Sequence, residues 1–308
     1  MKKKTVSFFD PSFKNENLPF FFRQTEGFKG IYDNINFFMN NLDADWQIVG
    51  TWVNNITKIK GKKIVYLQQE PPESKLPSKF ILDNSTFAIT PFKFDHFIKQ
   101  FITFTPLQWT YDLNITFENG KGHCIELINK NSLKYFKYQP IPEKNKICSM
   151  IVSTKSFLPG HLKRFNFTKK LIDHFKNKID FFGFGFNPIK NKKDAIDPYI
   201  YSIGIENSSY PNYWTEKIAD IYLGYTAPIY YGCTNIKNYF SEDSFIKLNI
   251  DNFDFSVHEI EKILNNPYSI DFEAIKEDRK KVIEKYNFFK IIADCIKKYE
   301  VSENVMAY

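Results

Sequence analysis

Apolar and polar positions in the second half of the chain alternate in a way that predicts a strand, a helix and another strand. A nearly unbroken apolar run covers residues 199–205, apolar residues then recur at helical spacing over 218–225, and a short apolar run follows at 227–231. The polar residues 206–217 therefore lie between the carboxyl end of a strand and the start of a helix. Open α/β sheets hold ligands at that place, and the free backbone N–H groups of the helix favour phosphate. We expect a nucleotide to bind there.

The first half of the chain predicts a second α/β region. Short apolar runs predict strands at residues 5–9, 46–50 and 64–68. A helical spacing of apolar residues covers 31–41, and the proline- and lysine-containing stretch 139–144 predicts a hinge. The expected units are thus an N-terminal α/β domain over residues 1–143 and a C-terminal α/β domain over residues 144–308.

The C-terminal domain is expected to end in helices. Ser256 and Glu259 have the spacing of a capping box, which predicts the start of a short helix. A longer helix with one continuous apolar face is predicted over residues 271–299.

The composition fits a two-domain protein that stays inside the cell. Of the 308 residues, 43% are hydrophobic and 18% are aromatic, which is enough to fill two cores. No apolar run reaches the ~18 residues of a membrane-spanning helix, and the lysines after Met1 lead into a predicted strand instead of a signal sequence. We expect a cytoplasmic protein whose N-terminal and C-terminal lysines give it a weak affinity for the inner face of an anionic membrane.

The formal net charge of +7 raises the question of nucleic-acid binding. Basic residues, however, are interleaved with acidic ones, and the chain has no arginine-rich stripe, zinc-finger spacing or aromatic-glycine RNA motif. The four cysteines and five histidines are scattered, without the spacing of a metal site. Asp43-Ala44-Asp45 precedes a predicted strand and so lies away from the sheet edge that holds ligands. We therefore expect no nucleic-acid partner and no essential metal.

Lys217 is the residue of the 206–217 segment that points most directly to an anion. A cation in the first turn of a helix opposes the helix dipole, and a bound anion would remove the conflict. On spacing alone, the alternative is equally good: Lys217 is simply exposed to solvent, and its interaction with the dipole lowers the stability of the helix by a few tenths of a kcal/mol. Glu216 likewise fits an ordinary first-turn acid, which the dipole favours.

Several short blocks around these residues occur in a fixed order. They are Glu206-Asn207-Ser208, Tyr213-Trp214-Thr215-Glu216-Lys217, Gly224 and Pro228-Ile229-Tyr230-Tyr231-Gly232. In order and spacing, over about 30 residues, they resemble the nucleotide-sugar motif of the α-1,3/1,4-fucosyltransferases, glycosyltransferase family 10. The family usually has an aromatic residue where this chain has Ile205.

The resemblance extends upstream more loosely. Residues 144–153 and 180–183 are similar to strands of the family's C-terminal domain, and the segment around Arg164 is similar to its phosphate-binding helix. Arg164 is one of only three arginines in the chain. A planar guanidinium also suits a diphosphate better than an ammonium does.

The resemblance implies a GT-B fold, in which two Rossmann-like α/β domains face a central cleft. It also implies a hexosyltransferase that moves L-fucose from GDP-fucose to a glycan hydroxyl with inversion, in an α-1,3-type linkage, and needs no cofactor. The N-terminal domain would hold the acceptor, an oligosaccharide or glycolipid of a lipopolysaccharide or other surface polysaccharide, and the C-terminal domain would hold the nucleotide sugar. The implied donor-binding residues are Arg164, Glu206, Asn207, Tyr213, Glu216 and Lys217.

Glu70 is the candidate catalytic base. It follows the predicted strand 64–68, and Pro71-Pro72 stops that strand, so its carboxylate is expected at the carboxyl end of the sheet. The family keeps its proposed base in a Glu-Ser-Pro setting after such a strand, and this chain has Glu-Pro-Pro there. Glu73, which precedes Ser74, is a rival for the role.

Two other functions remain open from the sequence. A related transferase for another nucleotide sugar would keep the same motif, because relatives can change sugar. A non-catalytic binder of nucleotides or glycans would keep the fold, although the presence of Glu70 together with Glu216 and Lys217 argues against loss of turnover.

Overall fold

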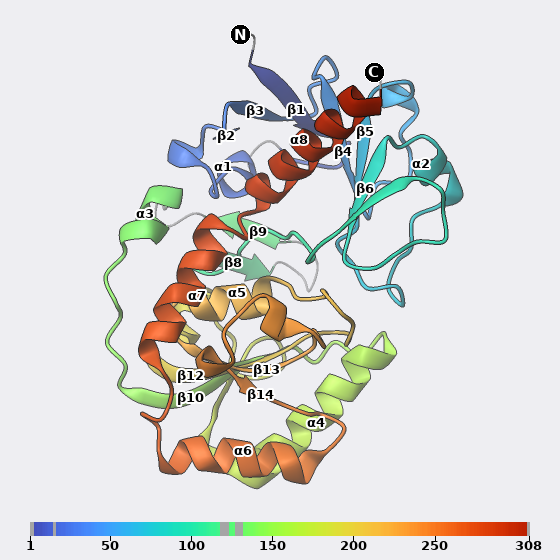
Figure 1. The fold of residues 1–308 in the computed structure, drawn as a ribbon. Coiled ribbons are helices and arrows are strands. Elements are labelled where there is room, and N and C mark those ends of the chain that lie inside the picture. Colours follow the sequence, from blue (N-terminus) through green and yellow to red (C-terminus); the bar gives the residue numbers. More distant parts are fainter. Residues whose placement is uncertain (1–2, 15–16, 118–122, 127–131, 307–308) are drawn as a thin grey trace. The chain divides into compact units, whose positions relative to one another are not determined.

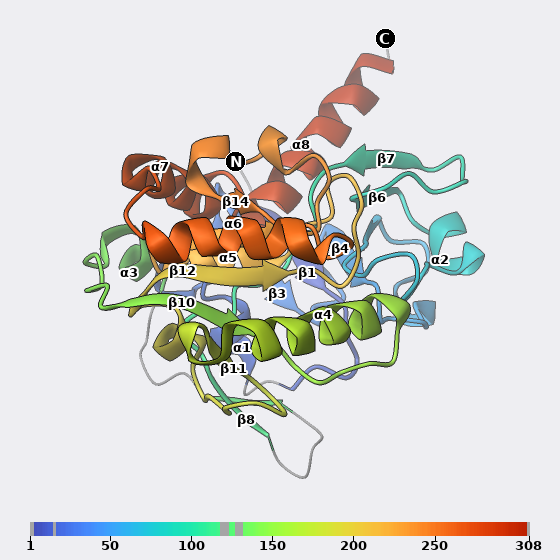
Figure 2. The same cartoon turned by 90° about the horizontal axis from the view of Figure 1, so that it is seen from below.

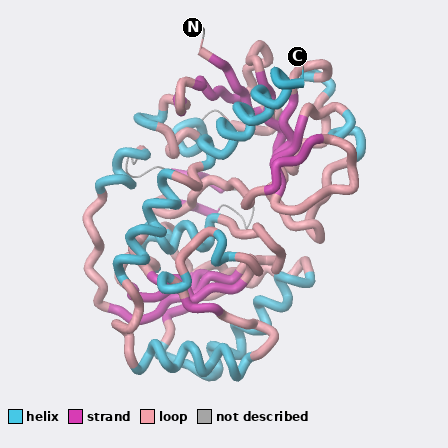
Figure 3. The backbone as a smooth tube through the Cα atoms, viewed as in Figure 1, coloured by secondary structure: helices cyan, strands magenta, loops and turns pink. Residues whose placement is uncertain are grey.

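The computed structural model describes residues 3–14, 17–117, 123–126 and 132–306. Contacts between Cα atoms divide the chain into two units. The first unit comprises Met1–Gln108, Asn131–Lys137 and Glu284–Tyr308, and the second comprises Trp109–Lys130 and Tyr138–Ile283. Figure 1 traces the chain through both units, and Figure 3 shows how strands and helices alternate along it.

A seven-stranded sheet forms the centre of the first unit, in the order β2-β3-β1-β4-β5-β6-β7. Neighbouring strands are parallel except for β2 and β3. The strands are β1 Lys4–Phe8, β2 Ile31–Tyr32, β3 Ile35–Met39, β4 Trp46–Gly50, β5 Ile64–Leu67, β6 Phe87–Thr90 and β7 Lys99–Ile102. The strand predicted at 46–50 is confirmed residue for residue, and those predicted at 5–9 and 64–68 are confirmed to within one residue at each end.

The sheet of the first unit is buried on both faces. Val65 and Leu67 of β5 belong to one apolar cluster, whereas Ile64 and Tyr66 belong to another, as expected from the alternation of side chains along a strand. The helices of this unit are α1 Leu18–Phe21, α2 Lys79–Asp83, α3 Leu133–Tyr138 and α8 Phe288–Met306, with short 3-10 turns η2 Glu26–Phe28 and η3 Thr57–Ile59. Helix α8 joins the first cluster and α2 joins the second.

The helix predicted over residues 31–41 is wrong, because this segment forms the β2–β3 hairpin. Asp33 and Asn34 adopt φ angles of 48° and 63°, the left-handed pair that a tight hairpin turn requires and that these two residue types tolerate. Ile35 and Phe37 are buried while Phe38 is 36% exposed, so the apolar pattern has the two-residue period of a strand.

The single helix predicted over residues 271–299 is also wrong, because the chain forms α7 Phe272–Glu284 and then α8. Asn287 interrupts the helix: its side chain accepts hydrogen bonds from the backbone N–H groups of Phe289, at 2.9 Å, and Lys290, at 3.2 Å, and so caps α8. The Asn287 amide donates to the Gln24 carbonyl at 2.9 Å, and the Gln24 side chain accepts from the N–H of Phe288. The structure therefore groups the last helix with the first unit, whereas the sequence placed all terminal helices in the domain from 144 to 308.

A five-stranded, fully parallel sheet forms the centre of the second unit, in the order β11-β10-β12-β13-β14. Its strands are β10 Lys146–Ile151, β11 Asp180–Phe182, β12 Tyr199–Ile205, β13 Ala227–Tyr231 and β14 Ile246–Lys247. A separate antiparallel pair consists of β8 Asn114–Phe117 and β9 His123–Glu126. The strands predicted at 199–205 and 227–231 are confirmed residue for residue.

Helices cover both faces of this second sheet, as in a doubly wound fold. Helices α4 Pro159–Phe175 and α6 Phe253–Asn265 lie on one face and α5 Glu216–Leu223 lies on the other (Figures 1 and 2). Short 3-10 turns complete the unit: η4 Lys176–Lys178, η5 Lys192–Ala195, η6 Ile236–Asn238 and η7 Glu242–Ser244. Helix α6 begins at Phe253, where the Asn252 side chain accepts from the N–H of Phe255, and not at the predicted capping box of Ser256.

A parallel sheet in each unit confirms the predicted α/β class. In the described parts of the chain, no helix combines the length and apolar composition that crossing a bilayer requires.

Candidate nucleotide-binding site

Glu206 is the first residue after β12, and its side chain is buried. The carboxylate accepts hydrogen bonds from the backbone N–H of Thr215, at 2.9 Å, and from the Thr215 hydroxyl, at 2.8 Å. The Lys217 ammonium lies 3.2 Å from the same carboxylate. A buried charge needs such partners. Glu206 therefore fixes the start of α5 from within the protein.

Gly232 gives the Glu206 side chain its space. A Cβ atom at Gly232 would lie 2.4 Å from Cγ of Glu206, and the φ angle of 152° is one that residues with a side chain rarely adopt. The neighbouring Tyr230 hydroxyl donates to Glu206 at 3.3 Å. The Pro-x-x-x-Gly block of the sequence thus packs against the Glu-Asn-Ser block.

Lys217 is held by protein groups at the start of α5. Its ammonium lies 3.5 Å from Glu216 and donates to the Thr215 hydroxyl at 3.1 Å. Burial alone would lower the pKa of Lys217, but the Glu206 and Glu216 carboxylates raise it above its ordinary value. The side chain is 24% exposed, so it is neither the freely solvated lysine of the alternative interpretation nor fully enclosed. It presents a permanent positive charge at a helix N-terminus.

Glu216 is held in its charged form. Burial would raise its pKa, but the ammonium groups of Lys217 and Lys192 and a hydrogen bond from Thr215 lower the pKa from 4.5 to about 2. Lys192 is itself fixed by Asp220, one turn further along α5, at 2.7 Å. The buried Asp220 carboxylate also accepts from the backbone N–H of Thr110 at 3.0 Å. Thr110 thereby supports the Asp220–Lys192 pair.

Arg164 approaches the same loop from α4. Arg164 is 6% exposed, and its Nη1 atom donates to the side-chain oxygen of Asn207. The Nε atom of Arg164 is buried and has no hydrogen-bond partner in the described structure. A Cβ atom on Gly160, at the start of the helix, would lie 1.7 Å from the Asn207 carbonyl oxygen, so α4 packs directly against the Asn207 backbone. Burial lowers the pKa of Arg164 below its usual range, and the carboxylates of Glu206 and Glu216 partly offset this.

Positive charges gather near the start of α4. Burial lowers the pKa of His161, and the nearby charges of Arg164, Lys155 and Lys217 lower it further. These side chains come from α4, the loop after β10 and the start of α5. Such a cluster disfavours any additional positive charge and favours an anion.

The predicted donor residues thus divide into two kinds. Arg164, Asn207, Glu216 and Lys217 come together through hydrogen bonds and charge interactions around the end of β12. Glu206 and Tyr213 are both buried, at 1% and 2% exposure. The sequence missed His161, Lys155, Lys192 and Asp220. Helical spacing is the signal that indicates two of them: His161 lies one turn before Arg164, and Asp220 lies one turn after Glu216.

Glu70 lies in the first unit, beyond the end of β5. The indole N–H of Trp52, which follows β4, donates to Glu70 Oε1 at 3.3 Å. The Gln68 side chain donates to the carbonyls of Glu70 and, at 2.8 Å, Lys75, so it holds the loop that carries both Glu70 and Glu73. Glu70 is half-buried and Glu73 is exposed. Glu70 is therefore the more constrained of the two candidates.

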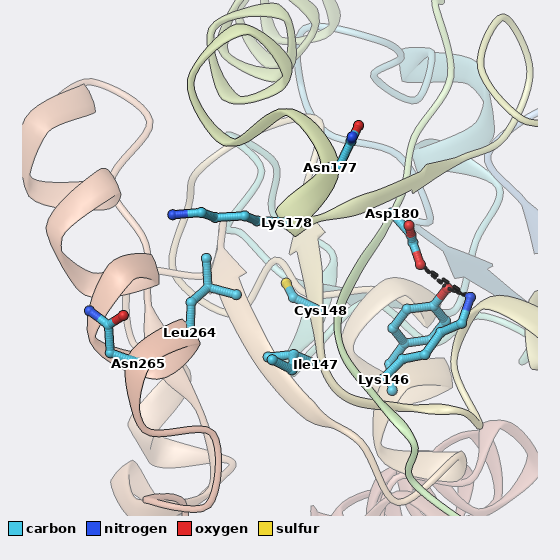
Figure 4. Close-up of a pocket in the computed structure, with 9 residues that line it drawn as sticks. Lys146, Ile147, Cys148, Asn177, Lys178, Asp180, Leu264 and Asn265 are labelled. Atoms are coloured by element: carbon cyan, nitrogen blue, oxygen red, sulfur yellow. Dashed lines mark hydrogen bonds and ion pairs between the residues drawn. The ribbon is translucent and has the colours of Figure 1, made fainter.

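A cavity of about 350 Å³ occurs elsewhere in the second unit. It lies beside Lys146, Asp180 and Tyr199, which begin strands β10, β11 and β12, with Leu264 and Asn265 of α6 on the opposite side (Figure 4). The carboxyl ends of parallel strands hold ligands, and this cavity is at their amino ends. None of the predicted donor-binding residues lines it.

Metal-binding clusters are not found in the part of the chain that the structure describes, where no group of three or more His, Cys, Asp or Glu side chains could hold an ion. Cys148, Cys233 and Cys295 are buried free thiols. Burial raises the pKa of Cys233 and Cys295 to about 12, which keeps both protonated at neutral pH.

Comparison with known proteins finds a family match over the C-terminal part of the chain. Residues 141–267 match the model of the glycosyltransferase family 10 (fucosyltransferase) C-terminal domain. The chain therefore carries a family 10 C-terminal domain. All six predicted donor-binding residues lie within it, and the predicted resemblance is confirmed.

A curated protein is similar to this chain over a shorter stretch. The α-(1,3)-fucosyltransferase FucT of Helicobacter pylori is 35% identical over 77 residues, which are 25% of this chain and 16% of that protein. The match thus spans about a sixth of the length of the relative.

Solved structures are similar in fold to nearly the whole chain. An α1,3-fucosyltransferase with GDP has a TM-score of 0.57 at 18% identity, with 94% of this chain and 95% of that chain covered. The structure of an α1,3-fucosyltransferase with GDP-fucose gives 0.52 at 18% identity over 91% and 90% of the two chains. Anabaena HepE in complex with UDP and glucose gives 0.52 at 10% identity over 97% and 100%. The predicted GT-B fold class is confirmed.

Proposed function

We propose that this protein is an inverting fucosyltransferase that moves L-fucose from GDP-fucose to a hydroxyl of an oligosaccharide or glycolipid, in an α-1,3-type linkage. The observation that carries the proposal is the charged group at the end of β12, where Arg164, Glu216 and Lys217 meet within a family 10 C-terminal domain. An α1,3-fucosyltransferase of the same fold has been solved with GDP-fucose.

Arg164 and Lys217 are the proposed ligands of the donor diphosphate. The Lys217 ammonium carries a stable positive charge at the N-terminus of α5, where the helix N–H groups also favour phosphate. Arg164 offers a buried guanidinium whose Nε lacks a partner among the described residues, and Asn207 holds it from the other side. Charge-assisted hydrogen bonds of this kind would stabilise the charge that develops on the leaving group. We expect this stabilisation to replace a metal ion.

Glu216 is the proposed partner of the ribose hydroxyls. Its pKa of about 2 keeps it ionised at neutral pH, and an ionised carboxylate is an acceptor for two hydroxyl donors. Glu206 and Tyr213 are proposed to act by shaping the site, since both are buried and Glu206 already binds Thr215 and Lys217.

Glu70 is the proposed catalytic base. In a single displacement, the acceptor oxygen forms a bond to the anomeric carbon of fucose while the bond from that carbon to the diphosphate breaks. The acceptor proton passes to the Glu70 carboxylate, and GDP leaves with the bonding electrons. The hydrogen bond from Trp52 and the loop held by Gln68 limit the positions that this carboxylate can take.

A ligand-induced stability screen tests the donor assignment. We expect GDP to raise the melting temperature, and UDP, CMP and ADP to raise it much less, since a ligand at 100 times its Kd stabilises by ~2.7 kcal/mol. Arg164→Ala and Lys217→Ala should each weaken GDP binding by ~1.5–3 kcal/mol. Lys169→Ala, which removes an exposed lysine from the same helix as Arg164, is the matched control and should bind GDP like wild type. Equal stabilisation by all four nucleotides would contradict the proposal.

A further inference from the structure

His161 lies one helical turn before Arg164 in α4, and neither the fold nor the predicted donor set gives it a role. Its Nδ1 atom is buried and has no hydrogen-bond partner among the described residues, as is also the case for Nε of Arg164. A neutral imidazole carries its proton on one ring nitrogen only, and the tautomer with the proton on Nε2 makes that atom the hydrogen-bond donor.

The first turns of α4 place His161 beside the proposed diphosphate ligands. Gly160, the preceding residue, packs against the Asn207 carbonyl so closely that a Cβ would be 1.7 Å from it. Arg164, the next residue on the same side of the helix, binds the Asn207 side chain. His161 is thus held between two contacts to the loop that follows β12.

We propose that His161 donates a hydrogen bond from Nε2 to the diphosphate of the nucleotide sugar, and that donor binding is coupled to protonation of this ring. The inference rests on the proposed function, because it assigns a further residue to the same donor site. Without a bound donor, the nearby cations Arg164, Lys155 and Lys217 favour the neutral imidazole over the imidazolium. A bound diphosphate reverses the local charge balance and favours the imidazolium.

The direction of the coupling follows from the charges that surround His161. Arg164 on its own helix, Lys155 from the loop after β10 and Lys217 on α5 all lower its pKa in the free protein, together with burial. The Glu206 and Glu216 carboxylates are already engaged with Lys217 and do not cancel this effect. A bound diphosphate opposes the three cations and raises the pKa. Binding therefore takes up a proton at pH values between the two pKa values, and affinity rises as the pH falls through that interval.

Calorimetric titration with GDP-fucose between pH 6 and 8 tests the inference, because neither phosphate of this donor titrates near neutral pH, unlike the terminal phosphate of GDP. We expect wild type to bind ~3–10-fold more tightly at pH 6 than at pH 8, since one full unit of pKa shift corresponds to tenfold. His161→Gln keeps a hydrogen-bond donor that cannot titrate, so its affinity should match wild type at pH 8 and should not rise at pH 6. His161→Phe should bind more weakly at both pH values.

His174→Gln is the matched control, because it removes another histidine of α4, one that is 41% exposed and pairs with Glu261. It should keep the wild-type pH dependence. In wild type alone, the binding enthalpy measured in buffers of different ionisation enthalpy should report proton uptake, a readout that needs no variant to fold.

The outcomes separate the inference from the proposed function. Wild-type binding of GDP-fucose without proton uptake, or with the same pH dependence in His161→Gln, overturns the role of His161 and leaves the proposed function standing. Failure of wild type to bind GDP-fucose at any pH overturns the proposed function, and the inference with it.

Discussion

At the scale of single residues, the proposed donor site contains a carboxylate, Glu216, that is held ionised beside lysines. Glu216 has a pKa of about 2 in the folded protein, against 4.5 for an ordinary glutamate. A lowered pKa stabilises the folded state fully above pH 4.5, and this contribution is lost as the pH falls toward 2. We expect Glu216→Gln to reduce the free energy of unfolding by roughly 1–3 kcal/mol at pH 7. The difference from wild type should shrink in urea titrations at pH 4, 3 and 2.5.

Glu242→Gln provides the comparison, because Glu242 is a 73%-exposed carboxylate in the same unit whose lysine partner is 3.9 Å away. Exposed pairs contribute little, so this variant should unfold almost like wild type. A difference between wild type and Glu216→Gln that is constant from pH 7 to pH 2.5 would show that the Glu216 charge is not specially stabilised.

The sequence predicted which residues gather at this site better than it predicted what each one contacts. Asn207, Glu216 and Lys217 could be predicted because a fixed order of short blocks is visible along the chain, and Arg164 because it is one of only three arginines and lies in a segment similar to the family's phosphate-binding helix. The engagement of Glu206 with Thr215 and Lys217 could not be found in that way, because it depends on how far each side chain is buried. His161 stands alone among scattered histidines, and its signal in the sequence is its position one helical turn before Arg164.

At the scale of elements, the contact between α4 and the loop after β12 joins the two halves of the donor site. Gly160→Ala places a methyl group where the Asn207 carbonyl oxygen is only 1.7 Å away, so the helix or the loop must move. We expect the unfolding free energy to fall by ~1–3 kcal/mol, the usual cost of overpacking, although alanine favours helix. GDP affinity should fall several-fold, because the Arg164–Asn207 contact moves with the helix.

Asn166→Ala, at an exposed position of the same helix, separates this effect from a change in helix propensity. It should leave GDP affinity unchanged. If Gly160→Ala proved as stable as wild type and bound GDP normally, the close approach of α4 to Asn207 would be wrong.

Elements with local signals were predicted well, and elements that depend on distant partners were not. The β12–α5–β13 unit could be predicted because each apolar run has one period and clear ends. The β2–β3 hairpin was mistaken for a helix because the left-handed turn at Asp33 and Asn34 interrupts a run of apolar residues that also fits helical spacing. The break before α8 could not be predicted from local sequence, because Asn287, which caps the helix, is held by Gln24, 263 residues away along the chain.

At the scale of the whole molecule, the chain builds two parallel-sheet units and returns to the first unit with its last helix. The sequence could predict two α/β units from the alternation of strands and helices. It could not predict that α8 packs with β1 and β4, because amphipathic spacing shows that a helix has a buried face and not which sheet covers it.

The two cationic side chains proposed for the diphosphate lead to a prediction about metal dependence. In the proposed mechanism Arg164 and Lys217 supply the positive charge that a divalent ion would otherwise supply, so we expect transfer to retain most of its rate in excess EDTA. The assay compares initial rates with EDTA, with Mg²⁺ and with Mn²⁺. A reaction that stops in the chelator and recovers only on addition of a divalent ion would contradict the charge-stabilising roles of Arg164 and Lys217.

The rate of fucosyl transfer by Glu70 variants tests whether the protein is a fucosyltransferase and whether Glu70 is its base. Initial rates of GDP release are measured at saturating GDP-fucose with a panel of oligosaccharide acceptors, for wild type, Glu70→Gln and Glu73→Gln, alongside GDP affinity by calorimetry. We expect acceptor-dependent release by wild type, a fall of ~10²–10⁴ in Glu70→Gln with nearly unchanged GDP affinity, and a nearly wild-type rate in Glu73→Gln. A wild-type rate in Glu70→Gln, or a collapse in Glu73→Gln alone, would contradict the assignment of the base. Absence of acceptor-dependent GDP release by wild type with every acceptor would contradict fucosyl transfer itself.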